Sequence, residues 1–264
     1  MYYIVIMKSI LLLGHSGYLG SFINVQLQCD ILDKSREIYD NGKQYDYVIN
    51  CIGKPNLEYC ELNQEETNYS NCDVILDIHK LYPSAKIINF SSYYVYDSDG
   101  LCSETSTTTD KYNYCRQKLQ GEKYVNDFGG INFRIGKLFG SLDINKQNKL
   151  TEHIIKSNEL ELDSVIFNPT SLKQVLDVVK WEIENNKLFG IYNLSNQHHI
   201  SHYNWGLYIN YFLDFHKKLT KLEKINRSFH NYGKFTMSIE KLNKVIPLRG
   251  WEEDLCEYLK QIKK

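Results

Sequence analysis

Short apolar runs recur through the first half of the chain, each bounded by polar residues or glycine. They occupy residues 9–13, 47–51, 86–90 and 131–135. A continuous apolar run of this length is typical of a central strand in a parallel sheet, where both faces of the strand are buried. The pattern therefore predicts four core strands.

Helix-like stretches separate these predicted strands. Residues 71–81 and residues 112–127 each place several large apolar side chains on one side of a helix. Strands that alternate with helices are the signature of a parallel sheet joined by right-handed crossovers. We therefore expect an α/β protein with a Rossmann-type parallel sheet.

The rhythm changes after the fourth predicted strand. Residues 172–184 and 201–215 have helical patterns, and residues 191–194 form a short apolar run typical of a strand. No internal repeat or flexible linker divides the chain. We expect a first domain over residues 1–140 and a smaller α/β lobe over residues 141–264, with some segments of the lobe returning to the first domain.

Composition narrows the possible classes of protein. The chain has 264 residues and a formal net charge of −1, which argues against nucleic-acid binding, because such proteins usually carry a basic excess. No apolar run approaches the roughly 18 residues that a membrane span needs, and the first residues do not resemble a signal peptide. The seven cysteines include no CxxC pair, so we expect reduced thiols, no metal site and a cytoplasmic protein.

Three glycines follow the first predicted strand directly. Gly14 permits a tight turn, Gly17 lets the backbone approach a pyrophosphate, and Gly20 allows a helix to pack closely on the strand. The beginning of a helix also favours the negative charge of a phosphate group. This spacing predicts a dinucleotide-binding loop. The other predicted contact residues within the loop are Ser16, Tyr18 and Leu19.

A second predicted cofactor contact falls on Asp30 and Ile31. Their place suits a loop beneath an adenine ring, where a carboxylate can accept a hydrogen bond from the exocyclic amine. Asp33, in the same segment, also suits the N-cap of a helix. The stretch between Gly20 and Asp30 is too short for a full crossover helix and a second strand. We therefore expect an abbreviated sheet near the second strand, and the choice between NADH and NADPH stays open.

Candidate catalytic chemistry lies on the helix predicted over residues 112–127. Tyr114 and Lys118 are four residues apart, hence on one face of that helix. Tyrosine has an unperturbed pKa of about 10, and a nearby ammonium favours the phenolate and lowers this pKa. Such a tyrosine can exchange a proton with a carbonyl or an alcohol. Ser92 follows an apolar strand, and the carboxyl ends of parallel strands are where ligands bind.

These features occur in the order found in one known family. The glycine loop, the segment 30–33, residues 50–53, Asn71 and the Ser92, Tyr114 and Lys118 set resemble an extended short-chain dehydrogenase/reductase. Within that group the chain is most similar to dTDP-4-dehydrorhamnose reductases and to the related UDP-4-keto-6-deoxyglucose 3,5-epimerase/4-reductases of rhamnose synthesis. The motifs of the second half that carry the resemblance include Asn168-Pro169-Thr170 and Ser201-His202.

The resemblance implies an oxidoreductase that uses NADPH or NADH to reduce a nucleotide-linked 4-keto-6-deoxyhexose, with UDP or dTDP as the nucleotide. In that reaction Tyr114 donates the proton, Lys118 lowers the pKa of the tyrosine and binds the nicotinamide ribose, and Ser92 orients the carbonyl. The resemblance also implies a homodimer.

Several other roles follow from the same resemblance. Cys51, Ile52 and Gly53 contact the cofactor. The first domain holds the dinucleotide, and the smaller lobe holds the nucleotide sugar. Asn71 takes part in a proton relay, although a plain helix-capping role fits its position equally well.

Two tyrosines depart from the patterns of related enzymes. Tyr93 follows Ser92 where many of these reductases carry Asp, and Tyr94 stands where the bifunctional enzymes carry the Cys used for epimerisation. We therefore expect a simple 4-reductase. One alternative is a nucleotide-sugar epimerase, or a bifunctional epimerase/reductase. Another is a redox-inert dinucleotide-binding regulatory protein, similar to the regulatory subunit of methionine adenosyltransferase.

Overall fold

The computed structural model describes residues 8–32, 38–97, 100–141, 149–223 and 235–263. The chain divides into two compact units. Unit 1 comprises Met1–Ser91, Asp110–Phe133 and Val179–Ile191, and unit 2 comprises Ser92–Thr109, Arg134–Val178 and Tyr192–Lys264. Among the described residues, no helix is long and apolar enough to cross a membrane.

A six-stranded sheet has the strand order β11-β6-β4-β3-β1-β2. Parallel pairing joins β1 to β2, β1 to β3 and β3 to β4. The six strands are β1 Ile10–Leu13, β2 Asp30–Ile31, β3 Tyr47–Asn50, β4 Lys86–Ser92, β6 Ile131–Ile135 and β11 Gly190–Leu194. The four predicted core strands are confirmed, and the strand predicted over residues 191–194 joins the same sheet. The chain passes from β1 to β2 on one side and then crosses back to β3 on the other side of β1, which makes the carboxyl ends of β1 and β3 a topological switch point.

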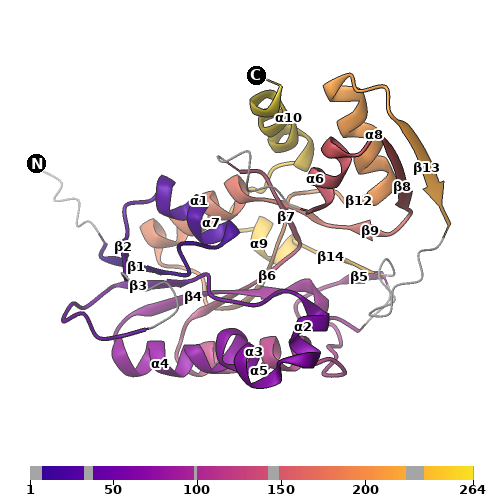
Figure 1. Ribbon diagram of the computed structural model, residues 1–264. Coiled ribbons are helices and arrows are strands. Elements are labelled where there is room, and N and C mark those ends of the chain that lie inside the picture. Colours follow the sequence, from indigo (N-terminus) through magenta and orange to yellow (C-terminus); the bar gives the residue numbers. More distant parts are fainter. Residues whose placement is uncertain (1–7, 33–37, 98–99, 142–148, 224–234, 264) are drawn as a thin grey trace, which may run out of the picture. The chain divides into compact units, whose positions relative to one another are not determined.

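Helices lie on both sides of the sheet. In Figure 1, α3, α4 and α5 lie on one side, and α1 and α7 lie on the other. These helices are α1 Tyr18–Gln26, α3 Gln64–Asn68, α4 Val74–Leu81, α5 Asn113–Asp127 and α7 Leu172–Asn185, and a short helix α2 spans Leu57–Leu62. Buried apolar side chains of α4 and α5 pack on those of the strands; this core includes Leu11, Leu13, Val48, Val74, Ile75, Ile78, Ile87 and Val125.

The sheet is abbreviated at its β2 edge, as expected. Strand β2 has only two residues, and residues 38–46, between β2 and β3, contain no helix. The prediction of a loop at Asp30 was wrong, because Asp30 pairs with Leu11 and begins β2. The following Leu32 is buried, which favours the strand despite the poor strand propensity of aspartate. The possible N-cap Asp33 lies outside the described residues.

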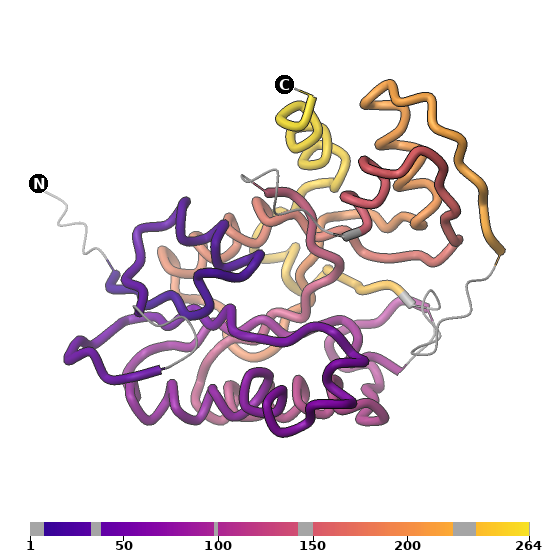
Figure 2. The backbone as a smooth tube through the Cα atoms, viewed as in Figure 1, coloured from indigo at the N-terminus to yellow at the C-terminus, as the bar shows by residue number. Residues whose placement is uncertain are grey.

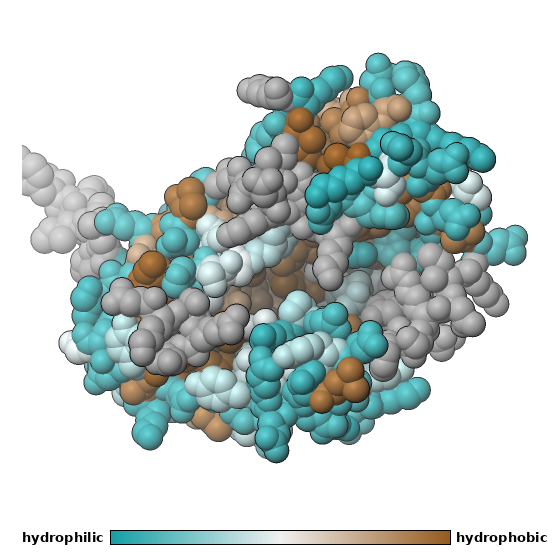
Figure 3. All heavy atoms as spheres, viewed as in Figure 1, coloured by the Kyte–Doolittle hydropathy of each residue, from teal (hydrophilic) through white to brown (hydrophobic). Residues whose placement is uncertain are grey.

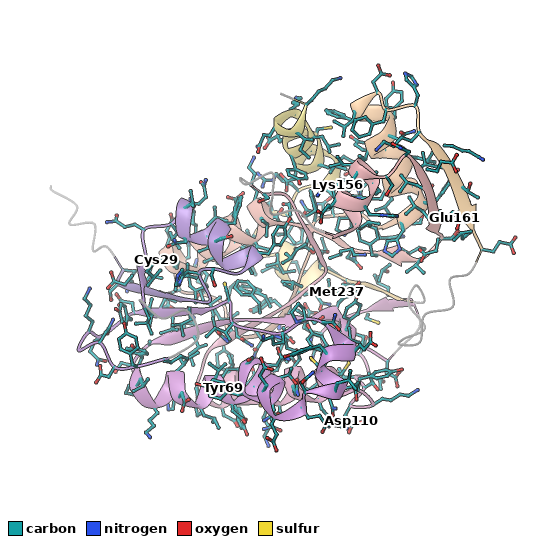
Figure 4. All side chains as sticks on the ribbon, viewed as in Figure 1. Cys29, Tyr69, Asp110, Lys156, Glu161 and Met237 are labelled. Carbon is teal, nitrogen blue, oxygen red and sulfur yellow. The ribbon has the colours of Figure 1, made fainter. Side chains whose placement is uncertain are left out.

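The helix predicted over residues 71–81 begins earlier than its pattern suggests. Helix α3 continues through a π-helical turn, η1 Tyr69–Asp73, directly into α4. Tyr69, labelled in Figure 4, marks the beginning of this turn. The residues from 64 to 71 are mostly polar, so the apolar spacing that announces a helix is missing there. Figure 2 shows this run beside α5, which it contacts along much of its length.

Unit 2 is built from short strand pairs and helices. Its strands are β5 Gly100–Cys102, β7 Lys137–Phe139, β8 Glu159–Asp163, β9 Ile166–Phe167, β10 Pro169–Ser171, β12 Ile200–Ser201, β13 Lys218–Leu222 and β14 Phe235–Met237. Its helices are η2 Tyr93–Val95, α6 Lys149–Lys156, α8 His202–Leu213, α9 Glu240–Asn243 and α10 Trp251–Ile262. Aromatic side chains of α8, α10, β7 and β9 form its core, in which Trp205 contacts Phe139, Phe167 and Trp251. The helices predicted over residues 172–184 and 201–215 are confirmed as α7 and α8.

Candidate active site

The glycine loop turns sharply at the carboxyl end of β1. Gly14 has a φ of +73°, and a Cβ atom there would lie 2.7 Å from the carbonyl carbon of Cys51. A Cβ on Gly20 would lie only 2.2 Å from the carbonyl oxygen of Gly14. Both positions therefore require glycine, one for its backbone conformation and both for close approach. The loop is pressed against the chain that leaves β3.

Helix α1 begins directly after this loop. Its N-cap is Gly17, whose N–H donates to the Gly14 carbonyl at 3.0 Å. Ser16 and Gly17 are exposed, Tyr18 is half-buried and Leu19 is buried. A glycine N-cap has no side chain to accept from the first helical N–H groups, so the beginning of α1 suits an anionic ligand. The side chain of Leu19 belongs to the core, which leaves its backbone as the part that can contact a ligand.

A chain of buried asparagines fixes the turn after β3. Asn50 accepts from the N–H of Ile52 at 3.1 Å and donates to Asn89 on β4 at 3.0 Å, and Asn89 donates to Asn132 on β6 at 2.9 Å. The predictions from the sequence missed this chain. Its signal was present, since a polar Asn interrupts three apolar strands that turned out to be neighbours. The chain orients the segment Cys51–Gly53, which was predicted to contact the cofactor.

Lys118 lies beside that segment. Its side chain is 6% exposed, and its Nζ donates to the carbonyl of Phe90 at 3.0 Å. A Cβ on Gly53 would lie 3.4 Å from this Nζ and 3.3 Å from Oδ1 of Asn71. Burial lowers the pKa of Lys118 to about 8, although the Glu122 carboxylate and the surrounding thiols act in the opposite direction. The turn after β3, the π-helical turn and α5 thus bring the predicted residues Gly53, Asn71 and Lys118 together.

Asn71 does not cap a helix, so that alternative was wrong. It lies inside η1 and its side chain holds the backbone of Lys54, accepting from the N–H at 2.8 Å and donating to the carbonyl at 3.2 Å. Its Nδ2 also donates to Oε1 of Gln117 at 2.9 Å. Asn71 therefore links the turn after β3 to the helix that carries Lys118.

Tyr114 is buried one helical turn before Lys118, near the beginning of α5. Ser92 is the last residue of β4, and its hydroxyl accepts from the N–H of Tyr94 at 3.2 Å. The neighbouring Ser91 donates to the buried Glu122 at 2.5 Å. The predicted helix face of Tyr114 and Lys118 is thus confirmed, and Ser92 stands at the carboxyl end of its strand as expected.

Asp30 and Ile31 lie apart from this cluster. They pair with Leu11 and Leu12, before the glycine loop begins. Lys43 donates to the Asp30 carboxylate at 2.8 Å and Tyr45 donates to it at 3.0 Å, and these hydrogen bonds lower the pKa of Asp30. The side chain is half-buried and already has two donors.

Unit 2 contains its own buried polar chain. Oδ1 of Asp163 lies 2.7 Å from Nδ1 of His202, and Nε2 of His202 lies 3.0 Å from Nζ of Lys137. An imidazole N–H donated to the carboxylate leaves the other ring nitrogen to accept from the ammonium. His202 thus fixes Lys137, the first residue of β7. Among the described residues, no group of three or more His, Cys, Asp or Glu side chains is arranged to hold a metal ion.

Comparison with known proteins agrees with this architecture. The structure resembles that of a dTDP-4-dehydrorhamnose reductase from Clostridium acetobutylicum, with a TM-score of 0.83 and 21% identity over 97% of this chain and 100% of that one. A dTDP-4-dehydrorhamnose reductase from Bacillus anthracis in complex with NADP gives a TM-score of 0.80 and 17% identity over 97% and 99%. A UDP-N-acetylglucosamine 4-epimerase from Methanobrevibacter ruminantium gives 0.78 and 17% over 96% and 97%.

At these identities the solved structures show a shared fold. A search of curated protein sequences gives no match. The model of one protein family, described as the RmlD substrate binding domain, matches residues 7–264. Because this match spans almost the whole chain, the protein belongs to the RmlD substrate binding domain family.

Proposed function

We propose that this protein is an NAD(P)H-dependent reductase of a nucleotide-linked 4-keto-6-deoxyhexose, acting in the synthesis of a rhamnose-like deoxysugar. The observation that carries the proposal is the placement of Lys118. Its buried amine, with a pKa lowered to about 8, lies beside Gly53 and one turn after Tyr114. Family membership supports the substrate class, and structural relatives bear the name dTDP-4-dehydrorhamnose reductase.

The residues of unit 1 fit a dinucleotide. The glycine loop and the beginning of α1, from Gly14 to Leu19, would bind the pyrophosphate. Gly14 and Gly20 allow the tight shape of this loop, because a Cβ at either position would clash with the backbone of Cys51 or of Gly14. Residues 51–53 would line the nicotinamide half, with Lys118 on the ribose hydroxyls. Asp30 and Ile31, on the edge strand, are proposed for the adenosine half. We favour NADPH, since one related reductase was solved with NADP.

When bound, the reduced nicotinamide supplies the hydride to C4 of the sugar. Side chains of the protein supply the proton that the carbonyl oxygen receives. Tyr114 donates from its phenol to the carbonyl oxygen, and the Lys118 ammonium stabilises the phenolate that is left. Ser92 donates a hydrogen bond to the same oxygen and so favours the developing alkoxide. Phe90 and Asn71 hold the lysine and the backbone beside it in place.

We also propose a homodimer in the cytoplasm. All seven cysteines are free thiols in the structure, and several are buried, which suits a reducing compartment. The resemblance to short-chain dehydrogenase/reductases implies a dimer interface that includes α5. The surface over α3 and α5 is mostly hydrophilic in Figure 3, and a cavity of about 590 Å³ lies against these helices.

The test is oxidation of NADPH and NADH with UDP- and dTDP-4-keto-6-deoxyglucose, each with and without an added 3,5-epimerase. Turnover only with the epimerase would establish a simple 4-reductase, as Tyr94 predicts. Turnover without it would establish a bifunctional enzyme. If no combination oxidises either cofactor, the substrate assignment is wrong.

Replacing Tyr114 with Phe should abolish turnover while NADPH still binds, because the phenol donates the proton and makes no contact required for the pyrophosphate. NADPH fluorescence measures binding, and absorbance of reduced nicotinamide measures turnover. Activity like that of the wild type in Tyr114→Phe would remove this residue from its proposed role.

A further inference from the structure

Helix α5 carries Tyr114 and Lys118, and a residue of another helix bonds to its beginning. It begins at Asn113, its N-cap Tyr112 makes no side-chain capping bond, and its first turn contains no acidic residue. The first N–H groups of a helix have no partner inside the helix and need acceptors from elsewhere. The acceptor here comes from another helix.

Glu61 of α2 supplies it. One carboxylate oxygen accepts from the backbone N–H of Asn113 at 2.7 Å, and the other accepts from Nδ2 of Asn113 at 3.0 Å. Both donors belong to one buried residue at the first position of α5. A carboxylate is also the charge that the positive end of a helix favours, and charge-assisted hydrogen bonds are stronger than neutral ones.

Asn113 is held from its other side as well. Its Oδ1 accepts from Nη2 of Arg116, and Nη1 of Arg116 donates to the carbonyl of Asp110 at 3.2 Å. Asp110, labelled in Figure 4, lies just before α5. The amide of Asn113 therefore has a defined orientation, with its nitrogen toward Glu61 and its oxygen toward Arg116.

The helix that carries Glu61 is tied to the predicted cofactor segment. Helix α2 begins after Asn56, whose side chain accepts from the N–H of Tyr59 at 2.9 Å. Cys60, next to Glu61, donates from Sγ to the carbonyl of Lys54 at 3.3 Å. Only a few residues separate Gly53, beside the Lys118 amine, from Glu61. Glu61 thus connects the turn after β3 with the beginning of the Tyr114 helix.

We propose that Glu61 is a positioning residue of the reaction, which sets the place of Tyr114 relative to the cofactor segment by capping α5. The proposal rests on the function proposed above. Glu61 acts through Asn113 and takes no part in proton transfer. Its loss should lower kcat far more than it changes the KM for NADPH.

Exchanging the side-chain types of Glu61 and Asn113 distinguishes a positioning role from general damage to the fold. In Glu61→Gln, the new amide nitrogen faces Nδ2 of Asn113, donor against donor. In Asn113→Asp, two carboxylates face each other. The double variant Glu61→Gln/Asn113→Asp exchanges donor and acceptor, so both contacts between the two residues, the net charge and the acceptor for Arg116 return. It loses only the long bond of 3.5 Å from Nδ2 of Asn113 to the Cys60 carbonyl. Glu58→Gln, at an exposed position on the same helix, is the control.

We expect each single variant to lose roughly tenfold in kcat per folded enzyme, with KM for NADPH within about twofold, and the double variant to recover most of the loss. Unchanged kcat in both single variants, or no recovery in the double variant, would overturn the proposal.

Amide hydrogen exchange at the beginning of α5 gives a reading without substrate. Exchange should be faster in the single variants and return toward the wild-type rate in the double variant. If the wild-type protein reduces no 4-keto sugar but the exchange rates differ between the variants as expected, the proposed function is wrong and Glu61 still caps α5. If exchange is the same in all variants, the role of Glu61 fails whatever the activity.

Discussion

Lys118→Met should make the protein more stable and inactive at the same time. The ammonium of Lys118 is buried, and burial lowers its pKa from 10.5 to about 8. Methionine has a similar length, carries no charge and fits an apolar surrounding. Because the reaction needs the ammonium, the substitution should abolish turnover.

The magnitude follows from the pKa shift. A shift of this size corresponds to roughly 3 kcal/mol by which burial disfavours the charged lysine in the folded protein. The penalty is complete below about pH 8. Between about pH 8 and 10.5 the unfolded chain binds a proton that the folded protein lacks, so this group makes the free energy of unfolding rise with pH. In Lys118→Met, the loss of the hydrogen bond to the Phe90 carbonyl offsets about 1–2 kcal/mol of the stability gained by removing the buried charge. The net gain near pH 7 is about 1–2 kcal/mol, or a few degrees in Tm.

Thermal unfolding of wild type and Lys118→Met, near pH 7 and again near pH 10, is the assay. The difference in Tm between the two proteins reports the titration of Lys118 alone, because the cysteines and tyrosines that titrate in the same pH range are present in both. Lys123→Met, at an exposed position on the same helix, should change Tm little at either pH. A Lys118→Met protein that melts well below wild type, with the same pH dependence, would refute the argument from burial.

Three further substitutions test separate parts of the structure. Gly20→Ala places a methyl group 2.2 Å from a backbone oxygen of the glycine loop, so NADPH fluorescence titration should show Kd raised at least tenfold; an unchanged Kd would contradict the cradle. The buried Glu182 accepts from Lys86 and from two backbone N–H groups. Glu182→Gln should therefore lower the free energy of unfolding, measured in urea, by about 3 kcal/mol. Glu184→Gln, at an exposed position, is the control, and an equal loss of stability in both variants would refute the prediction. Ser92→Ala should lower kcat roughly a hundredfold and spare NADPH binding; unchanged kcat would remove the serine from the site.

The central strands were predictable because buried parallel strands leave a plain signal in the sequence. The apolar runs before Gly14 and around Val48, Ile88 and Phe133 all became strands of one sheet. Tyr114 and Lys118 were predictable as a pair for a similar reason, since helical spacing alone puts them on one face.

Other features depend on contacts between distant segments. The π-helical turn around Asn71 has no local signal, because it is stabilised by bonds to Lys54 and Gln117 that only the fold brings near. Asp30 was assigned to a loop because its strand is two residues long and is specified by pairing with β1 rather than by its own pattern. The cap that Glu61 provides for Asn113 spans two helices, and no spacing rule within one helix could have revealed it.

The reductase activity itself is tested by following the hydride. NADPH deuterated at the transferred position of nicotinamide C4 is incubated with the nucleotide-linked 4-keto-6-deoxyhexose, and the product is examined by NMR, with Tyr114→Phe in parallel. We expect one deuterium at C4 of the sugar for each NADPH oxidised, and no transfer in the variant. Sugar that changes configuration without gaining deuterium, while the cofactor stays reduced, would contradict the reductase and identify an epimerase.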